Sequence, residues 1–339
     1  MDYEILIMSL EGYGKGGLGT LAHNLHHLLV ANGIPSVLVA SGNPKGLPNV
    51  LVLDENDYGP VPQLAQRYSA RYRLVFGRNE LTFLSQHLND LVLITGGTAY
   101  LQDWLLIHPQ KTALDFLRLK KLPKDLRSDR INRERSALKQ AVKILSAPGL
   151  NRRILEKAYP EFSDKIFEVP QIFERVDSET PWEKREIDLI AVAQWKDRGV
   201  DRDVKGYRLL AEICTLLERE SLRTVVVGEV PFSINGVTHT GSLDHGETLK
   251  LMENARVFVS PSRNECYSQA IVEAIQLDCN VVLSRNVEPH SFCHPSLIAR
   301  YDRSSFCLKI EKALSRRYPV RSLPSPDDSL RLLLSALGA

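Results

Sequence analysis

The sequence has 339 residues, which is enough for two domains of ordinary size. Apolar residues make up 43% and charged residues 25%, and the 20 glycines and 18 prolines exclude a collagen-like or low-complexity chain. The 43 basic and 41 acidic residues leave a net charge of +2, which favours neither a nucleic-acid-coating protein nor an acidic disordered one. Any preference for a charged partner must therefore be local.

The cysteines and the first residues indicate the cellular compartment. Five cysteines with no CxxC pair argue against a disulfide framework or a zinc ribbon and favour a reducing environment. The start, MDYEILIMSL, carries acids before a short apolar run and no basic region, so it predicts a first strand rather than a signal peptide. No apolar stretch reaches the roughly 20 residues of a membrane-spanning helix. We expect a cytoplasmic protein that does not cross a membrane.

Two series of short apolar runs alternate with helical patterns. The runs are 4–10, 35–41, 73–77, 90–95 and 141–147 in the first series, and 187–193, 224–228, 255–260 and 280–284 in the second. This alternation predicts an α/β fold of two Rossmann-like, doubly wound parallel sheets facing a cleft. The expected divisions are a first domain at 1–170, a polar linker at 171–186, a second domain at 187–315, and a tail at 316–339 that packs back on the first domain.

A glycine-rich loop, EGYGKGGLGT at 11–20, follows the first predicted strand. Gly16 and Gly17 let the backbone approach a ligand closely, and the helix after them offers free N–H groups to an anion. One alternative is a deviant P-loop ATPase that depends on Lys15, but the lysine that should stand directly before Thr20 is missing. The other alternative is a tight strand-to-helix turn without a ligand.

Three short patterns look like metal sites. They are the helical trio His23, His26 and His27, the cluster His290, Cys293 and His294, and the DxD sequence Asp201-Arg202-Asp203. The first has no carboxylate or cysteine beside it, the second has no partner pair, and the third lies in a polar loop between a strand and a helix. We therefore expect packing or solvated roles for these residues and no bound metal.

The most informative segment is SPSRNECYSQAIVEAIQLDCNVVLS at 260–284. A strand that ends at Pro261 is followed by a turn with Glu265 and by a helix that begins near Ser268 and holds Glu273. The start of this helix has free N–H groups and a positive dipole end, which suit the pyrophosphate of a nucleotide. Glu273 can lean back toward that end and accept hydrogen bonds from ribose hydroxyls. Two surface glutamates beside an ordinary helix are the alternative.

This segment resembles the signature of the retaining glycosyltransferases of the GT-B fold, especially glycosyltransferase family 4 (group 1). That signature is roughly PS-x-x-E-x-F-G, then E-A, and it is matched here by Pro261-Ser262, Glu265, Tyr267-Ser268 and Glu273-Ala274. The resemblance is strong from about 187 to 285 and looser before that. It implies a GT-B fold and the transfer of a sugar from a nucleoside-diphosphate donor to an acceptor hydroxyl, with retention.

The resemblance also implies roles for individual residues. Glu265 is expected to contact the donor sugar, Glu273 the ribose, and Lys205 the departing diphosphate. The expected donor-binding residues are Gly16, Gly17, Lys196, Arg198, Lys205, Gly228, Cys266, Tyr267, Ser268 and Glu273, and the expected catalytic residues are Glu265, Lys205 and His108. His108 enters as the acceptor-side histidine, with capping or packing as its alternative. The nucleotide sugar is a substrate, so we expect no cofactor and no metal.

The chain departs from the signature near the expected phosphates. Ala193-Gln194 stands where the family usually has Gly-Arg, so the cation has to come from the longer loop, from Lys196, Arg198 or Arg202. Ser268 and Asp278 stand where glycine is common, although aspartate tolerates left-handed backbone geometry. If no cation reaches the phosphates, the alternative is a catalytically weak GT-B-like protein that binds nucleotides or glycans as a scaffold.

Residues 111–157 form a basic stretch, with 14 basic and five acidic residues. Such segments are attracted to anionic lipids by about 1 kcal/mol for each nearby cation and can equally hold an anionic acceptor. Nucleic acid is not expected, because aromatic side chains are not interleaved. We therefore expect a glycan or glycolipid acceptor in cell-surface polysaccharide or glycolipid synthesis, with peripheral contact at the inner face of the membrane. A solvated helical face is the alternative.

Overall fold

The computed structural model divides the chain into two compact units. It describes residues 3–9, 17–43, 45–54, 59–68, 70–76, 83–84, 88–95, 98–123, 126, 128–193, 203–217, 222–288, 290–321 and 323–338. The first unit consists of Met1–Trp104, Leu119–Glu174 and Pro324–Ala339, and the second of Leu105–Arg118 and Arg175–Leu323. A short segment of the first half of the chain thus belongs to the second unit, and the C-terminal residues belong to the first.

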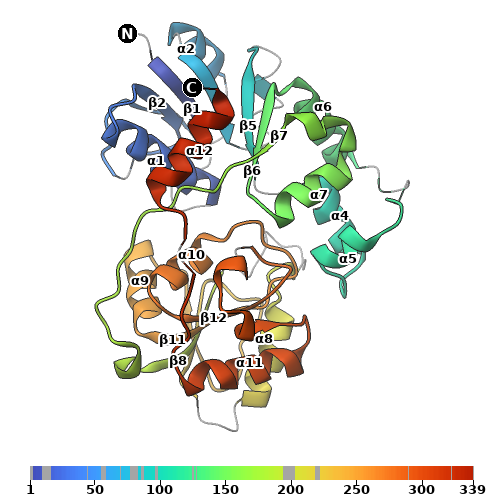
Figure 1. Cartoon of the computed structure of the whole chain (residues 1–339), viewed down its shortest axis with the longest axis vertical. Helices are drawn as coiled ribbons and strands as arrows, with labels where there is room; N and C mark the ends of the chain where they lie inside the picture. The colour runs from blue at the N-terminus through green and yellow to red at the C-terminus, as the bar shows by residue number, and fades with distance from the viewer. Residues whose placement is uncertain are drawn as a thin grey trace. The chain divides into compact units, whose positions relative to one another are not determined.

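The first unit is built on a parallel sheet of seven strands in the order β3-β2-β1-β4-β5-β6-β7 (Figure 1). The strands are β1 (Tyr3–Ser9), β2 (Ser36–Ala40), β3 (Val50–Val52), β4 (Ala70–Phe76), β5 (Leu91–Thr95), β6 (Lys143–Ser146) and β7 (Ile166–Glu168). The helices are α1 (Gly17–Ala31), α2 (Val61–Arg67), α4 (Ala99–Ile107), α6 (Asp129–Gln140), α7 (Leu150–Ala158) and α12 (Pro326–Leu337). The central strands are buried on both faces, which is why they read as continuous apolar runs.

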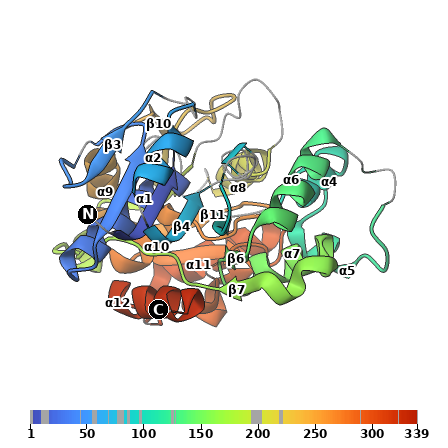
Figure 2. The same cartoon turned by 90° about the horizontal axis from the view of Figure 1, so that it is seen from above.

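The C-terminal helix α12 packs against α1 of the same unit (Figures 1 and 2). Ser325 and Asp328 form a capping box at its start, and Gly338 ends it in a left-handed conformation with φ 85°. The ammonium of Lys143, on β6, donates to the last carbonyls of the helix, at 2.6 Å from Ala336 O and 2.9 Å from Leu337 O. A cation is favourable there because the carbonyl end of a helix carries a partial negative charge.

The second unit is built on a parallel sheet of six strands in the order β10-β9-β8-β11-β12-β13. The strands are β8 (Ile187–Val192), β9 (Thr224–Val227), β10 (Val237–Gly241), β11 (Ala255–Ser260), β12 (Asn280–Ser284) and β13 (Ile298–Ala299). The helices are α5 (Ala113–Arg118), α8 (Tyr207–Leu217), α9 (His245–Glu253), α10 (Gln269–Gln276) and α11 (Arg303–Ser315). The expected fold class of two Rossmann-like parallel sheets is confirmed.

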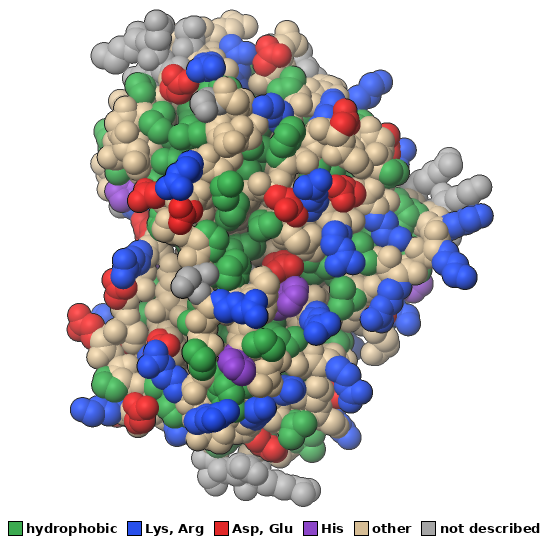
Figure 3. Space-filling model, in the orientation of Figure 1, with side chains coloured by type: hydrophobic (Ala, Val, Ile, Leu, Met, Phe, Trp, Pro, Cys, Tyr) green, Lys and Arg blue, Asp and Glu red, His purple; other side chains and the backbone are tan. Residues whose placement is uncertain are grey.

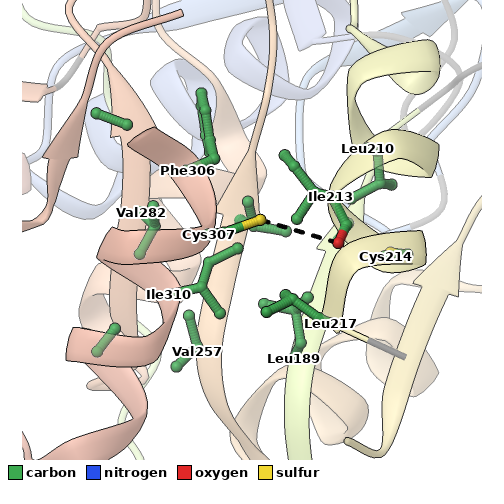
Figure 4. Close-up of a cluster of buried hydrophobic side chains, with 14 of the residues drawn as sticks. Leu189, Leu210, Ile213, Cys214, Leu217, Val257, Val282, Phe306, Cys307 and Ile310 are labelled. Carbon is green, nitrogen blue, oxygen red and sulfur yellow. Dashed lines mark hydrogen bonds between the residues drawn. The ribbon is translucent and has the colours of Figure 1, made fainter. Parts of the chain in front are cut away.

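The core of the second unit shows why α8 and α11 cover one face of its sheet. Figure 4 shows their apolar side chains meeting above the central strands. Phe306 and Ile310 of α11 and Ile213 of α8 are fully buried, and Leu189 and Val257 of the sheet are fully buried beneath them. Each such side chain stabilises the fold by about 1.5–3 kcal/mol relative to exposure.

The four strands that the apolar runs did not predict, β3, β7, β10 and β13, are the edge strands of the two sheets. Each has two to five residues. Edge strands are paired on one side only and are partly solvated, so their residues need not be continuously apolar. In β10, the sequence VTHTG contains no buried residue. Sequence patterning therefore located the centre of each sheet and not its edges.

The segment between the two sheets is fixed on the second unit from about residue 176 onward. Arg185 is buried, and its guanidinium donates to the carbonyls of Ala255 at 2.9 Å and Leu277 at 2.7 Å. A carboxylate oxygen of Glu253 accepts the N–H groups of Glu179 at 2.9 Å and Thr180 at 3.1 Å. The Glu253 carboxylate thus replaces the ladder partner that these N–H groups lack, and Arg185 anchors the segment to the sheet and to the end of α10.

The glutamate that holds this segment gives a test by pH. Its bond to the N–H of Glu179 lowers the pKa of Glu253 below the ordinary value of 4.5, so its stabilising effect is present above pH 4.5 and is lost as the pH falls through the lowered pKa. Glu253→Gln should lower the free energy of unfolding by about 1 kcal/mol at pH 7, because charge-assisted bonds are lost. Urea unfolding at pH 7 and pH 3.5 measures this, and the difference from wild type should shrink at the lower pH.

The control is Glu183→Gln, which changes an exposed glutamate of the same segment. We expect it to change the free energy of unfolding by less than about 0.5 kcal/mol at either pH. A Glu253→Gln effect of equal size at both pH values would contradict the assigned role of the carboxylate.

Candidate functional site

The candidate site lies where the second sheet changes direction. The chain runs from β8 outward to β9 and β10, and then returns to add β11 on the other side of β8. The carboxyl ends of β8 and β11 therefore border the crevice in which ligands of such sheets bind. The described residues there are 203–206, before α8, and 261–268, between β11 and α10.

Two opposite charges from these loops meet in the crevice. The ammonium of Lys205 donates to Oε2 of Glu265 in an ion pair, and the two side chains are 34% and 18% exposed. Glu265 is held by backbone bonds as well, because its N–H donates to the carbonyl of Asn286 at 3.3 Å and its carbonyl accepts from Glu288 at 3.0 Å. The predicted catalytic pair is thus brought together by the fold, with the carboxylate on a fixed backbone.

A close backbone approach makes this meeting possible. Gly206 has φ 76°, and a Cβ at this position would lie 1.9 Å from the carbonyl oxygen of Pro261, inside any real contact distance. Glycine is therefore required both for the dihedral angle and for the space. Next to it, Asp203 accepts the N–H of Tyr207 at 2.6 Å and so caps α8. Burial raises the pKa of the Asp203 carboxyl group.

A buried arginine, Arg263, joins the site loop to the segment that the second unit takes from the first half of the chain. Its Nε donates to the carbonyl of Asp203 at 3.0 Å, and its Nη1 donates to the carbonyls of Leu105 at 3.2 Å, His108 at 3.3 Å and Lys111 at 3.3 Å. The side chain is 2% exposed. No sequence pattern indicated this role, because Arg263 stands at one of the two unspecified positions of the PS-x-x-E pattern.

Glu273 lies on α10 and is nearly buried, with its side chain 8% exposed. Its Oε1 accepts from Nε2 of Gln269 at 2.8 Å and lies 2.8 Å from Nε2 of His245, the first residue of α9. The expected Gly228 follows β9 with φ 106°, and its N–H donates to the carbonyl of Gly241 at 2.8 Å. His245 was missed by the sequence reading, because nothing in the linear pattern places it beside α10.

The helix that was expected to begin near Ser268 begins at Gln269, with Ser268 as its N-cap residue. Cys266 and Tyr267 precede it and are 7% and 8% exposed. Burial raises the pKa of the Tyr267 hydroxyl, with a smaller contribution from the charge of Glu288. Asp278, after the helix, adopts φ 62°, a left-handed geometry that aspartate tolerates.

The histidines of α1 have structural roles. The ring nitrogens of His23 lie 2.9 Å from the carbonyl oxygens of Gly19 and of Gly42. Those of His26 lie 2.9 Å from Oγ of Ser36 and 2.7 Å from the carbonyl oxygen of Pro48. Both rings therefore fasten α1 to its neighbouring loops in the first unit. Among the residues that the structure describes, no group of three metal-ligating side chains occurs.

Several expected site residues lie outside the described residues. They are Gly16, Lys196, Arg198 and, among the alternatives, Lys15, Asp201 and Arg202. Gly17 is the first residue of α1, the helix that follows β1 in the chain. His108 directly follows α4 and belongs to the segment 105–118 of the second unit. Its carbonyl accepts from the guanidinium of Arg263 and, at 3.0 Å, from the N–H of Lys111. Its acceptor-side role stays a prediction.

Comparison with known proteins places the residues of the candidate site inside a family match. Residues 198–316 match the model of the family described as glycosyl transferases group 1, and this range holds Lys205, Glu265 and Glu273. No curated protein matches the sequence. The resemblance to group 1 glycosyltransferases that the signature indicated is confirmed over this range.

Solved structures of low sequence identity share the fold. Sucrose-phosphate synthase (tll1590) from Thermosynechococcus elongatus is 14% identical, with a TM-score of 0.62 over 99% of this chain and 93% of that chain. WaaG, a glycosyltransferase involved in lipopolysaccharide biosynthesis, is 12% identical, with a TM-score of 0.65 over 98% and 94%. Alr3699/HepE from Anabaena, in complex with UDP and glucose, is 12% identical, with a TM-score of 0.63 over 99% and 94%. At these identities the likeness establishes the GT-B architecture of the chain.

The close approach of the two site loops predicts that one methyl group added at Gly206 will strongly destabilise the protein. Gly206→Ala should lower the free energy of unfolding by about 3 kcal/mol or more, because the left-handed φ and the contact with the carbonyl of Pro261 both oppose a Cβ. Urea unfolding at pH 7 measures the change. The matched control is Gly246→Ala in α9, where the nearest atom lies at 3.4 Å, so a gain of about 0.5 kcal/mol is expected. Equal stabilities of the two variants would contradict the proposed approach.

Proposed function

We propose that the protein is a glycosyltransferase that moves a sugar from a nucleoside-diphosphate donor to an acceptor hydroxyl, with retention of configuration. The observation that carries the proposal is the grouping of Lys205, Glu265 and the start of α10 at the crevice of the second sheet, inside the range that matches group 1 glycosyltransferases. A nucleotide sugar needs three kinds of contact, for its phosphates, its sugar and its ribose. Each of these three contacts has a candidate residue near the carboxyl ends of the strands of the second sheet.

The diphosphate is assigned to Lys205 and to the N-terminus of α10. The first turn of α10 has N–H groups without helical partners, and the positive end of the helix dipole favours an anion. A lysine ammonium adds a point charge that can follow the leaving phosphate. Glu265, paired with Lys205, is assigned to the hydroxyls of the donor sugar. When the donor binds, these hydroxyls replace the ammonium of Lys205 as hydrogen-bond donors to the carboxylate of Glu265.

The ribose is assigned to Glu273. Its carboxylate has four lone-pair sites, and Gln269 and His245 occupy part of them at Oε1. Ribose hydroxyls donate hydrogen bonds, so the other oxygen, Oε2, is the acceptor proposed for them. His245 and Gln269 then hold the carboxylate in position, which lowers the entropy lost when the nucleotide binds.

In the transfer step, the bond between the anomeric carbon and the phosphate oxygen breaks, and its electron pair leaves with the diphosphate. The acceptor oxygen bonds to the same face of the sugar, and its proton is lost to the departing phosphate. Charge builds on the phosphate while the sugar becomes oxocarbenium-like. A fixed ammonium beside that oxygen lowers the barrier because it interacts more strongly with the transition state than with the bound substrate.

The donor base and the acceptor are assigned from weaker observations. HepE, which shares the fold, was solved with UDP and glucose, and this supports UDP as the first nucleotide to test. The basic stretch includes α6, where Arg133 and Lys139 are exposed. In Figure 3, the blue side chains of lysine and arginine gather on the side of the molecule that carries α7. We propose that this surface of the first unit meets a glycolipid or an anionic membrane. No described helix is long and apolar enough to span a bilayer.

Nucleotide binding is the first prediction of this proposal. In calorimetric titrations against UDP, GDP, ADP and ATP, we expect one nucleoside diphosphate to bind, with UDP the first candidate. Glu273→Ala should weaken that binding about tenfold, because two ribose hydrogen bonds to a carboxylate are lost. The control is Glu311→Ala, which removes an exposed carboxylate of α11. Binding of ATP alone would support the P-loop alternative, and diphosphate affinity that Glu273→Ala leaves unchanged would contradict the assigned ribose site.

Transfer from the donor is the second prediction. Lys205→Ala should lower kcat by about 100-fold and weaken diphosphate binding by less than about tenfold, because the ammonium acts mainly on charge that develops in the transition state. Release of nucleoside diphosphate from a sugar donor with an acceptor glycan present measures kcat. Full activity would contradict the role of Lys205. Diphosphate binding without transfer in the wild type would support the scaffold alternative.

A further inference from the structure

The second unit contains a cavity beside the candidate site. Its volume is about 510 Å³, within the range of small-molecule sites. Its walls are two parts of the chain that are far apart in sequence, the segment with α5 and the loops after β12 and β13. The lining residues that bear on its chemistry are Asp115, Arg118, Arg285, Asn286 and Arg300.

The cavity opens on the same sheet edge as the candidate site. It lies at the carboxyl ends of β12 and β13, and β12 is the direct neighbour of β11. The two sites share a loop, because the carbonyl of Asn286, in the cavity wall, accepts the N–H of Glu265. A ligand in the cavity is therefore separate from the crevice between β8 and β11, where the donor is placed, and adjacent to it.

The cavity is rich in positive charge. Arg118, Arg285 and Arg300 line it together with one carboxylate, that of Asp115. The carboxylate is already committed to the start of α5, because its Oδ2 accepts the N–H and the hydroxyl of Thr112, both at 2.9 Å. Its nearest approach to the guanidinium of Arg118 is 3.8 Å. Three cations around one concave space repel one another, and an anion between them removes this repulsion.

The other two arginines also keep hydrogen-bonding capacity. Arg300 is 85% exposed, and its carboxylate neighbour Asp302, at 3.4 Å, is itself bonded to the N–H of Ser305 at 2.8 Å as the cap of α11. Arg285 is exposed, and within the described part of the chain no carboxylate forms an ion pair with it. A guanidinium presents five N–H donors in a planar fork, so one ion pair leaves several of them for a ligand.

The wall that carries Arg118 is fixed in place before any ligand arrives. The N–H of Ala113 donates to the carbonyl of Arg263 at 3.1 Å, and the N–H of Leu114 donates to Oδ1 of Asn286 at 3.2 Å. These bonds hold the start of α5 against the loops that follow β11 and β12. A rigid wall reduces the entropy that ligand binding has to overcome.

We propose that this cavity binds a phosphate or carboxylate group of the acceptor. The shape and charge of a guanidinium suit bidentate bonds to either group, and a cavity lined by one sign of charge concentrates ligands of the opposite sign. The donor diphosphate has its own partners in Lys205 and α10, so the arginines of the cavity serve a second anion. The term acceptor rests on the proposed function, whereas the anion site itself does not.

The test uses inorganic phosphate as the probe, with UDP present at saturation so that the donor crevice is filled. Calorimetric titration at constant ionic strength should give binding in the millimolar range. The double variant Arg285→Gln with Arg300→Gln should bind phosphate about tenfold more weakly, because two charge-assisted contacts are lost. The control is Arg223→Gln. Arg223 is an exposed arginine directly before β9, so it lies at the amino end of a strand, whereas the cavity lies at the carboxyl ends.

The outcomes separate this proposal from the proposed function. Phosphate binding that is absent, or that falls equally in the double variant and in Arg223→Gln, would overturn the anion site. UDP affinity is measured in the same variants and should change less than about twofold, since the cavity lies outside the donor crevice. Failure of the wild-type protein to bind any nucleoside diphosphate would overturn the proposed donor site. The titration with phosphate would then be made without UDP, and its result would still show whether the cavity binds an anion.

A second arm distinguishes the source of the anion. Sedimentation with vesicles of phosphatidylglycerol and phosphatidylcholine, compared with vesicles of phosphatidylcholine alone, measures binding to a lipid phosphate. Loss of vesicle binding in the double variant, with Arg223→Gln unaffected, would identify an acceptor whose phosphate belongs to a lipid. Vesicle binding that is the same in both variants, together with arginine-dependent binding of inorganic phosphate, would identify a soluble anionic acceptor. Both of these outcomes support the anion site.

Discussion

The candidate site depends on the close approach of two loops in the second unit. Gly206, after β8, and Pro261, after β11, leave no room for a side chain between their backbones. Lys205 and Glu265 are 60 positions apart in the sequence, and this approach brings them into one ion pair. The approach is itself a consequence of the sheet order, because β8 and β11 are neighbours where the direction of strand addition reverses. A binding crevice at such a point is a property of the fold, and the side chains decide its chemistry.

Two buried arginines hold irregular segments of the second unit in place. A segment without helix or strand has carbonyl groups with no ladder partner, and leaving them unpaired in the interior costs free energy. Arg263 donates to the carbonyls of Leu105, His108 and Lys111. Arg185 donates to the carbonyl of Thr180, in the irregular segment before β8, and to that of Leu277, after α10. One guanidinium satisfies several acceptors at once, which a lysine ammonium does with less directional bonds. Arg263 also donates to the carbonyl of Asp203, so it joins the two loops of the candidate site to each other.

Positive charge recurs along the carboxyl edge of the second sheet, from Lys205 after β8 to Arg300 after β13. The net charge of the whole chain is only +2, so this distribution is local. The proposed donor, which would leave as a diphosphate, would need the cation at one point of this edge, and the cavity holds further cations at another point. An anionic acceptor would account for this second group, and its attraction to the cavity would also bring its hydroxyl toward the donor sugar.

The sequence by itself determined the central strands of both sheets and the start of α10, because these depend on apolar runs and helix caps within a few residues. It also marked Glu265 and Glu273, through the resemblance of residues 260–284 to the signature of group 1 glycosyltransferases. Only the tertiary structure decided the four edge strands, the role of Arg263, the contact of His245 with Glu273 and the cavity lined by arginines. Each of these joins residues that are distant along the chain. Local patterns carry no information about which distant groups will meet, so folding alone settles those contacts.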